Sequence, residues 1–107
     1  MSMKDYTDIS PKERRRVRDR DSIEDTPCCI FCGSPYNIEI AHYVPRSRGG
    51  IGQRTNLACL CRSCHTILDN GADKKKADEI REVFKDWLMR NYPNWTEEEQ
   101  IYRKANR

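Results

Sequence analysis

Two pairs of cysteines have the spacing of metal-binding knuckles. Cys29 and Cys32 form one CxxC pair, and Cys61 and Cys64 form a second pair after 28 intervening residues. Two residues between cysteines let both sulfurs reach one tetrahedral zinc ion at about 2.3 Å. One pair alone would also suit a redox dithiol, but the chain lacks the βαβ pattern that usually hosts one. We therefore expect a four-cysteine zinc site, which is closed to chemistry and serves as a structural staple.

Zinc is favoured over disulfides because the sequence has no secretory signal. Residues 1–30 contain no apolar run that could form a signal-peptide core, and no stretch could cross a bilayer. The sequence therefore predicts a cytoplasmic protein with reduced thiols. Two cysteines are surplus. Cys28 could compete as a ligand despite its wider spacing to Cys32, and Cys59 is expected to be a small buried side chain.

The segment between the knuckles carries the other residues that could do chemistry. It contains His42, Asn56 and a basic loop with three glycines between positions 49 and 52, and His65 follows Cys64 directly. A lone histidine is most often structural. Here one histidine is expected to end a strand and the other to start a helix, and zinc would tie these two elements together. Imidazole can act as a base near pH 7 or bind a divalent ion.

Hydrophobic periodicity predicts the elements that position these residues. Residues 36–42 alternate as a strand, residues 56–60 can form a second strand, and a helix should follow Cys61 and stop at Gly71. Residues 96–99 have the form of a capping box for a short final helix. The clearest helix spans residues 73–90, with one apolar stripe made by Ala77, Ile80, Val83, Phe84, Trp87 and Leu88.

Length and composition indicate one small α+β domain. The chain has 107 residues, of which 36% are hydrophobic and 35% charged, so its core is small, and chains of this size often add a disulfide or a structural metal. We expect a basic, flexible arm over residues 1–26, which could also form a weakly ordered helix. A core over residues 27–72 should hold the knuckles, and a helical extension over residues 73–107 should pack on that core.

The positive charge is concentrated in the middle of the chain. Residues 40–65 contain no carboxylate, which suits a polyanion such as nucleic acid, although a solvated basic face has the same composition. Because these cations lie around a glycine loop, we expect them to contact phosphates rather than bases. The candidate nucleic-acid-binding residues are Arg46, Arg48, Arg54 and Arg62.

Around His42 the sequence closely resembles the HNH endonuclease family, in particular its small phage-associated members. The matching stretches are IAHYVPRSRGG at 40–50, NL at 56–57 and LCRSCH at 60–65, within a resemblance that covers about residues 27–70. The resemblance implies a ββα-metal fold, in which a hairpin packs on a helix with one divalent ion between them. It also implies a metal-dependent DNA endonuclease of low sequence specificity that makes nicks or double-strand breaks.

The resemblance implies a role for each matching residue. His42 would be the general base that takes a proton from the attacking water, and His65 would bind the catalytic Mg²⁺, Mn²⁺ or Ni²⁺. Asn56 would orient the base or complete the ion's shell. The products would carry a 5′-phosphate and a 3′-hydroxyl. The resemblance further implies a phage or prophage protein in a bacterial host, with phage packaging proteins as partners and with neither a membrane nor an organic cofactor.

Ala41 departs from the family pattern, because many members have an ion-binding Asp or His immediately before the base. Two carboxylates could replace that ligand. Asp69 lies four residues after His65 and so on the same helix face, whereas Glu39 shares a strand face with Ala41. We favour Asp69, because a histidine and a carboxylate one turn apart can share an ion. Asp69 is also compatible with an ordinary turn at the helix C-terminus.

Two other functions fit the same residues. A zinc-stapled DNA-binding module without catalysis is supported by Ala41, but a pure binder needs neither His42 nor His65 in this order. A protein-interaction module could dock a partner on the helix over residues 73–90, although that helix is more simply explained as packing on the core. The nuclease is the leading hypothesis.

Overall fold

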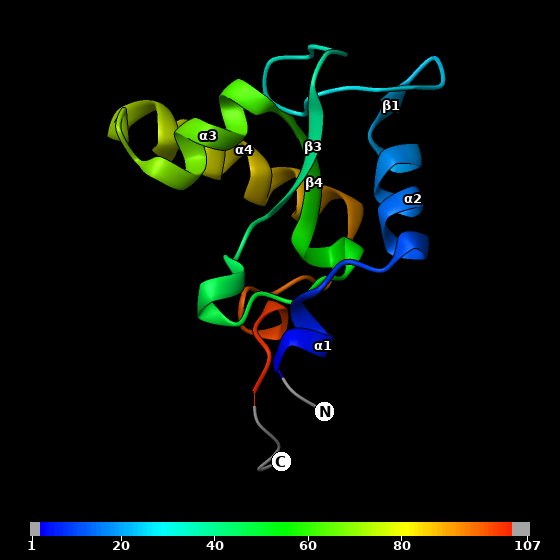
Figure 1. Ribbon diagram of the computed structural model, residues 1–107, viewed down its shortest axis with the longest axis vertical. Coiled ribbons are helices and arrows are strands. Elements are labelled where there is room, and N and C mark those ends of the chain that lie inside the picture. Colours follow the sequence, from blue (N-terminus) through cyan, green and yellow to red (C-terminus); the bar gives the residue numbers. More distant parts are fainter. Residues whose placement is uncertain (1–2, 104–107) are drawn as a thin grey trace.

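A computed structural model describes residues 3–103 (Figure 1). The fold is small α+β, as predicted, with two antiparallel two-stranded sheets. In chain order its helices and strands are α1 (Met3–Thr7), α2 (Pro11–Arg20), β1 (Ser22–Ile23), β2 (Thr26–Pro27), β3 (Ile38–His42), β4 (Leu57–Cys61), α3 (Arg62–Asn70) and α4 (Lys74–Asn91). Single 3-10 turns lie at Arg46–Arg48, Arg54–Asn56 and Glu98–Gln100.

The expected hairpin and helix are present as β3, β4 and α3. The two strands pair antiparallel, with Ile38 opposite Cys61 and His42 opposite Leu57. Gly71 ends α3 in the left-handed conformation at φ 66°, and its N–H donates to the carbonyl of Ile67. Glycine adopts this conformation without the strain that a Cβ would cause. This unit places His42 at the end of a strand and His65 on the helix.

Helices cover both faces of the hairpin, so the molecule has three layers. Figure 1 shows α2 on one side of β3 and β4, and α3 with α4 on the other. All five residues of β4 are buried for this reason. Leu60 packs in the cluster that contains Phe84 and Leu88 of α4, whereas Leu57 lies on the opposite face.

Residues 11–20 form a docked helix, which corrects the expectation of a flexible arm there. Ser10 caps α2 by accepting a hydrogen bond from the N–H of Glu13, and Pro11 occupies the first turn. Val17 is fully buried against Leu57 and Cys59. Polar composition alone predicted mobility because the apolar surface that α2 covers lies some forty residues away along the chain.

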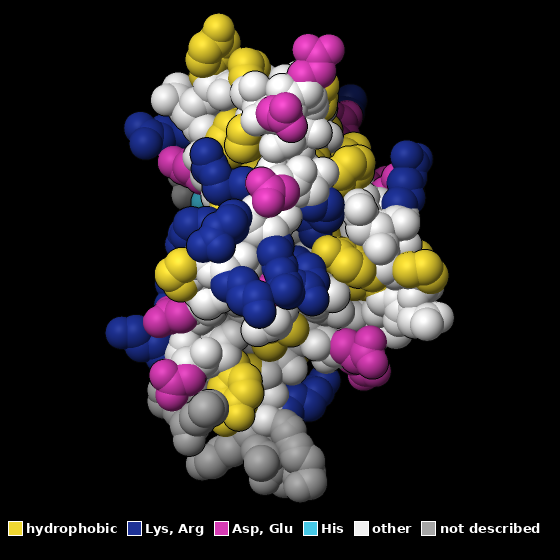
Figure 2. All heavy atoms as spheres, turned by 90° about the vertical axis from the view of Figure 1, so that its right-hand side faces the viewer, with side chains coloured by type: hydrophobic (Ala, Val, Ile, Leu, Met, Phe, Trp, Pro, Cys, Tyr) yellow, Lys and Arg dark blue, Asp and Glu magenta, His cyan; other side chains and the backbone are white. Residues whose placement is uncertain are grey.

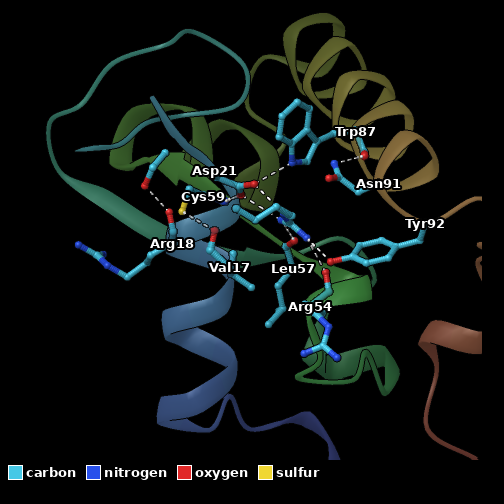
Figure 3. Close-up of polar contacts among 11 residues, drawn as sticks. Val17, Arg18, Asp21, Arg54, Leu57, Cys59, Trp87, Asn91 and Tyr92 are labelled. Atoms are coloured by element: carbon cyan, nitrogen blue, oxygen red, sulfur yellow. Dashed lines mark hydrogen bonds and ion pairs between the residues drawn. The ribbon is translucent and has the colours of Figure 1, made fainter. Parts of the chain in front are cut away.

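A buried carboxylate fixes the end of α2 (Figure 3). Asp21, whose side chain is fully buried, accepts hydrogen bonds from Arg20 Nε at 2.6 Å, Trp87 Nε1 at 2.9 Å and the Cys59 N–H at 2.8 Å. The guanidinium of Arg20 also donates to the hydroxyl of Tyr92 at 3.0 Å. Burial lowers the pKa of Arg20, but its bonds to Asp21 outweigh burial and leave that pKa raised. This Asp21 network joins α2, β4 and α4.

The C-terminal segment packs on the core much as its periodicity predicts. The buried residues of α4 are Ala77, Ile80, Phe84 and Leu88, while Val83 is 38% exposed and lies at the edge of the stripe. The expected final helix is only a 3-10 turn, with the Thr96 hydroxyl accepting from the Glu99 N–H. Residues 1–2 and 104–107 of the predicted arm and extension lie outside the described residues. Over residues 3–103 no helix has the length and apolarity needed to span a membrane.

Candidate active site

The four knuckle cysteines meet at one point. The sulfur atoms of Cys29, Cys32, Cys61 and Cys64 all lie within 4.8 Å of one another, which fits the ligand set of a tetrahedral zinc site. Cys61 ends β4 and Cys64 lies in the first turn of α3, so the cluster ties strand to helix. The four side chains could hold a structural zinc ion.

The surplus cysteines are outside this cluster. Cys28 donates from its sulfur to the carbonyl of Thr26 at 3.2 Å, and Cys59 is fully buried in the layer beneath α2. Burial and the neighbouring Asp21 raise the pKa of Cys59 to about 12, so it stays a neutral thiol. Within the cluster, burial and then the Cys61 thiol raise the pKa of Cys64. The Cys64 thiolate would therefore need a cation beside it.

A second site is an open groove of about 630 Å³ between the hairpin, α3 and α2. Both histidines line it, together with Asp69 of α3 and Arg46 of the loop after β3. Arg14 of α2 also lines it. The chain thus brings the predicted base, the predicted ion ligand and its favoured partner to one solvent-accessible surface.

Within residues 3–103, one ring nitrogen of His42 has a hydrogen-bond partner and the other has none. Its Nε2 lies 2.9 Å from the backbone carbonyl oxygen of Thr7, so Nε2–H donates and Nδ1 keeps its lone pair. Burial lowers the pKa of His42, and the positive charge of Arg46 adds to this effect. A neutral imidazole with a free Nδ1 is the form that a general base requires. No local pattern in the sequence indicated that Thr7 would reach His42.

His65 is held between two carboxylates. Its Nδ1 donates to Glu39 Oε1 at 2.8 Å, and its Nε2 lies 3.1 Å from Asp69 Oδ2. Adjacent ligands of an octahedral ion about 2.1 Å away lie about 3 Å apart, so this pair fits a shared divalent ion. The hydrogen bonds from His65 and Arg62 lower the pKa of Glu39, which therefore remains a carboxylate that orients the imidazole.

Asn56 and Ala41 are both fully buried in the protein. Asn56 is fully buried; its Oδ1 accepts from the Val44 N–H at 2.9 Å, and its Nδ2 donates to the carbonyls of Val44 and Ile51. Within residues 3–103 all its side-chain hydrogen bonds go to this loop. Asn56 thus fixes the loop after His42, and none of its side-chain hydrogen bonds within the described residues reaches the ring of His42 or His65. Ala41 is fully buried opposite Ala58, where an ionised ligand would face the core.

Three of the four predicted DNA-binding arginines are engaged with carboxylates. Arg46 pairs with Asp8, Arg54 Nη1 lies 3.0 Å from Glu13 Oε2, and Arg62 Nε lies 3.0 Å from Glu39 Oε2. Of the four, only Arg46 lines the groove. The carboxylates come from other parts of the chain, so the charge count for residues 40–65 did not reveal them. Within residues 3–103 no carboxylate pairs with Arg48.

Residues 29–71 match the family model described as HNH endonuclease. This segment is an HNH endonuclease domain. The match confirms the resemblance and contains both knuckles and every candidate residue of the groove from His42 to Asp69. The HNH domain indicates nuclease activity in general and implies DNA as substrate. No curated protein and no solved structure matches the chain. Helix α2 lies outside the HNH domain, yet its Arg14 lines the groove, as does Ile9 just before this helix.

Proposed function

We propose that the protein is a metal-dependent endonuclease that hydrolyses phosphodiester bonds of DNA with low sequence specificity. The observation that supports this proposal is that one groove contains both histidines. Within residues 3–103 the Nδ1 of His42 has no hydrogen-bond partner, and the Nε2 of His65 lies beside Asp69. Hydrolysis needs a base that takes a proton from water and a cation that stabilises negative charge on the phosphate. His42 could be the base, and His65 with Asp69 could bind the cation.

His42 is the proposed general base. Its Nδ1 takes a proton from water as the water oxygen attacks phosphorus, and the bond from phosphorus to the 3′ oxygen breaks. The products carry a 5′-phosphate and a 3′-hydroxyl. The carbonyl of Thr7 fixes the tautomer by accepting from Nε2–H, and it also stabilises the imidazolium that forms.

His65 and Asp69 are the proposed ligands of a Mg²⁺, Mn²⁺ or Ni²⁺ ion. When bound, that ion would supply positive charge to the scissile phosphate and the departing 3′ oxygen. Glu39 serves them indirectly: by accepting from His65 Nδ1–H it leaves the Nε2 lone pair directed toward Asp69. Asp69 thus takes the place of the ligand that the family pattern has at Ala41.

The four cysteines are proposed to bind structural zinc. This zinc would hold the end of β4 against the start of α3 and so fix His65 relative to His42. A phage or prophage origin, a bacterial cytoplasmic location and phage packaging partners remain predictions from the resemblance alone.

A DNA-binding module without catalysis is the second candidate. The observation in its favour is Ala41, which offers no ligand atom and is buried. The two functions differ in one property, because a pure binder does not cleave DNA with any ion.

Cleavage of supercoiled plasmid by the purified full chain tests the proposal. We expect nicking with Mg²⁺, Mn²⁺ or Ni²⁺ and none without a divalent ion. Asp69→Ala should raise the ion concentration for half-maximal rate by at least about 10-fold, because even loss of an outer-shell partner of a metal ligand typically costs about 10- to 100-fold in affinity. Asp78→Ala, which removes an exposed α4 carboxylate, is the control. No cleavage with any ion, while zinc content and DNA binding are intact, would replace the nuclease with the binding module.

A further inference from the structure

Helix α2 presents a row of cations that the HNH domain does not contain. Its buried side is marked by Glu13 and Val17. At about 100° per residue, Arg14 and Arg18 lie one turn apart on one flank of that side, about 60° and 100° from Val17. Arg16 lies on the opposite flank, where it pairs with Glu13 at 3.5 Å. Arg14 and Arg18 therefore lie on a different side of α2 from Arg16 and its partner Glu13.

The flank with Arg14 adjoins the groove. Arg14 lines the groove with His42 and His65, so the row begins beside the proposed catalytic residues. Figure 2 shows Lys and Arg side chains gathered over the face of the molecule that α2 forms. In Figure 3 the side chain of Arg18 points away from the Asp21 network, toward the outside.

The charge of this row is not neutralised within the described chain. Over residues 3–103, neither Arg14 nor Arg18 has a carboxylate within ion-pair distance. This differs from Arg46, Arg54 and Arg62, whose guanidinium groups all contact carboxylates. Two groove-lining arginines therefore lack a carboxylate partner within residues 3–103: Arg14 of α2, and Arg81 of α4, which donates to the carbonyl of Tyr43 at 3.1 Å. Only Arg14 continues along its helix into a second unpaired cation, Arg18.

We propose that Arg14 and Arg18 bind consecutive phosphates of a DNA strand on one side of the scissile bond. This inference rests on the proposed function, because it assumes that the groove takes DNA. A guanidinium fork matches phosphate geometry, and contacts to the backbone carry no sequence information. The Asp21 network holds α2 rigidly against β4 and α4, so the row is positioned before DNA arrives.

The experiment measures DNA binding apart from cleavage. The full chain carrying His42→Ala is titrated, without added divalent ion, into a fluorescent 30-base-pair duplex at several salt concentrations. The test variant adds Arg14→Gln and Arg18→Gln. The matched control adds Lys12→Gln and Arg16→Gln, which remove the same charge at the same spacing from the other flank. Thermal unfolding of each variant shows that α2 remains docked.

We expect the test variant to weaken binding by about tenfold and to reduce the salt slope by about 2, one for each lost phosphate contact. The control should change affinity less than about twofold, because its cations lie away from the groove. An equal loss of DNA affinity in the test and control variants, or no loss in the test variant, would contradict the proposal that Arg14 and Arg18 bind phosphates. Plasmid cleavage by the wild-type chain distinguishes this proposal from the nuclease proposal. If the chain does not cleave, but only the Arg14 and Arg18 substitutions weaken DNA binding, the nuclease proposal alone is refuted.

Discussion

The ring nitrogen Nε2 of His42 lies 2.9 Å from the backbone carbonyl oxygen of Thr7. The proposed base is therefore oriented by α1, a helix outside the HNH domain. Gly52 holds α1 in place, since its N–H donates to the carbonyl of Tyr6 at 2.8 Å. A Cβ at Gly52 would lie only 2.1 Å from the carbonyl oxygen of Asp8.

Gly52→Ala should displace α1 and loosen His42 while leaving the groove's charges in place. We expect the nicking rate to fall by about 10- to 100-fold, because small misplacements of a catalytic group have effects of this size. Affinity for duplex DNA should change little. Gln53→Ala, which shortens the exposed side chain of the next residue, is the control. Equal rates for the two variants would show that α1 does not position the base.

The pH dependence of cleavage should report the buried position of His42. Burial lowers its pKa below the ordinary value of 6.5, and the charges of Arg46 and His65 act in the same direction. The neutral ring is the active form, and a lowered pKa keeps the ring neutral further into acid. Single-turnover rates should therefore fall on the acid side with a midpoint below 6.5. A midpoint at about 7 or above would contradict this environment.

Adjacent cysteines should respond differently to the same substitution. Cys29→Ser should abolish stoichiometric zinc and cost on the order of 3 kcal/mol or more of folding free energy, because a structural ion contributes directly to folding. Cys28→Ser should keep both zinc and stability, since Cys28 lies outside the cluster and serine can still donate to Thr26. Zinc content and chemical unfolding measure the two effects. Loss of zinc from both variants would require a different ligand set.

The buried Asp21 should contribute far more to the free energy of unfolding than the nearby Asp19. Asp21→Asn leaves Arg20 charged and buried without its partner, so we expect a loss of about 3 kcal/mol in the free energy of unfolding. Asp19→Asn changes an exposed side chain of the same helix and should stay within about 0.5 kcal/mol. Urea unfolding of both variants makes the comparison. Similar values would mean that the Asp21 network does not stabilise the docking of α2.

The ββα unit could be predicted because its signals are local. CxxC spacing, the alternation before His42 and the glycine that ends α3 each depend on a few neighbouring residues. The position of Asp69 beside His65 followed from helical spacing in the same way. Because the residues in each of these patterns are close in sequence, few other local structures are compatible with them.

The docking of α2 could not be predicted, because it depends on a distant segment. The hydrogen bonds of Asn56 to Val44 and Ile51 depend on the folded conformation of the loop, which no local pattern indicates. One signal for the docking of α2 was present: Leu57 to Cys61 is a continuous apolar run, which indicates a strand covered on both faces. A hairpin with only α3 and α4 behind it leaves one face open, and α2 is the segment that covers it. The carboxylates that meet Arg46 and Arg54 likewise come from segments before residue 20.

The central claim is that His42 acts as the base of a DNA nuclease. Its most direct test compares wild type and His42→Ala in single-turnover cleavage of plasmid with Mn²⁺, with DNA affinity measured on the same preparations. We predict that the rate falls by at least about 100-fold while affinity stays within about twofold, as loss of a general base requires. Cleavage by His42→Ala at the wild-type rate would contradict the claim.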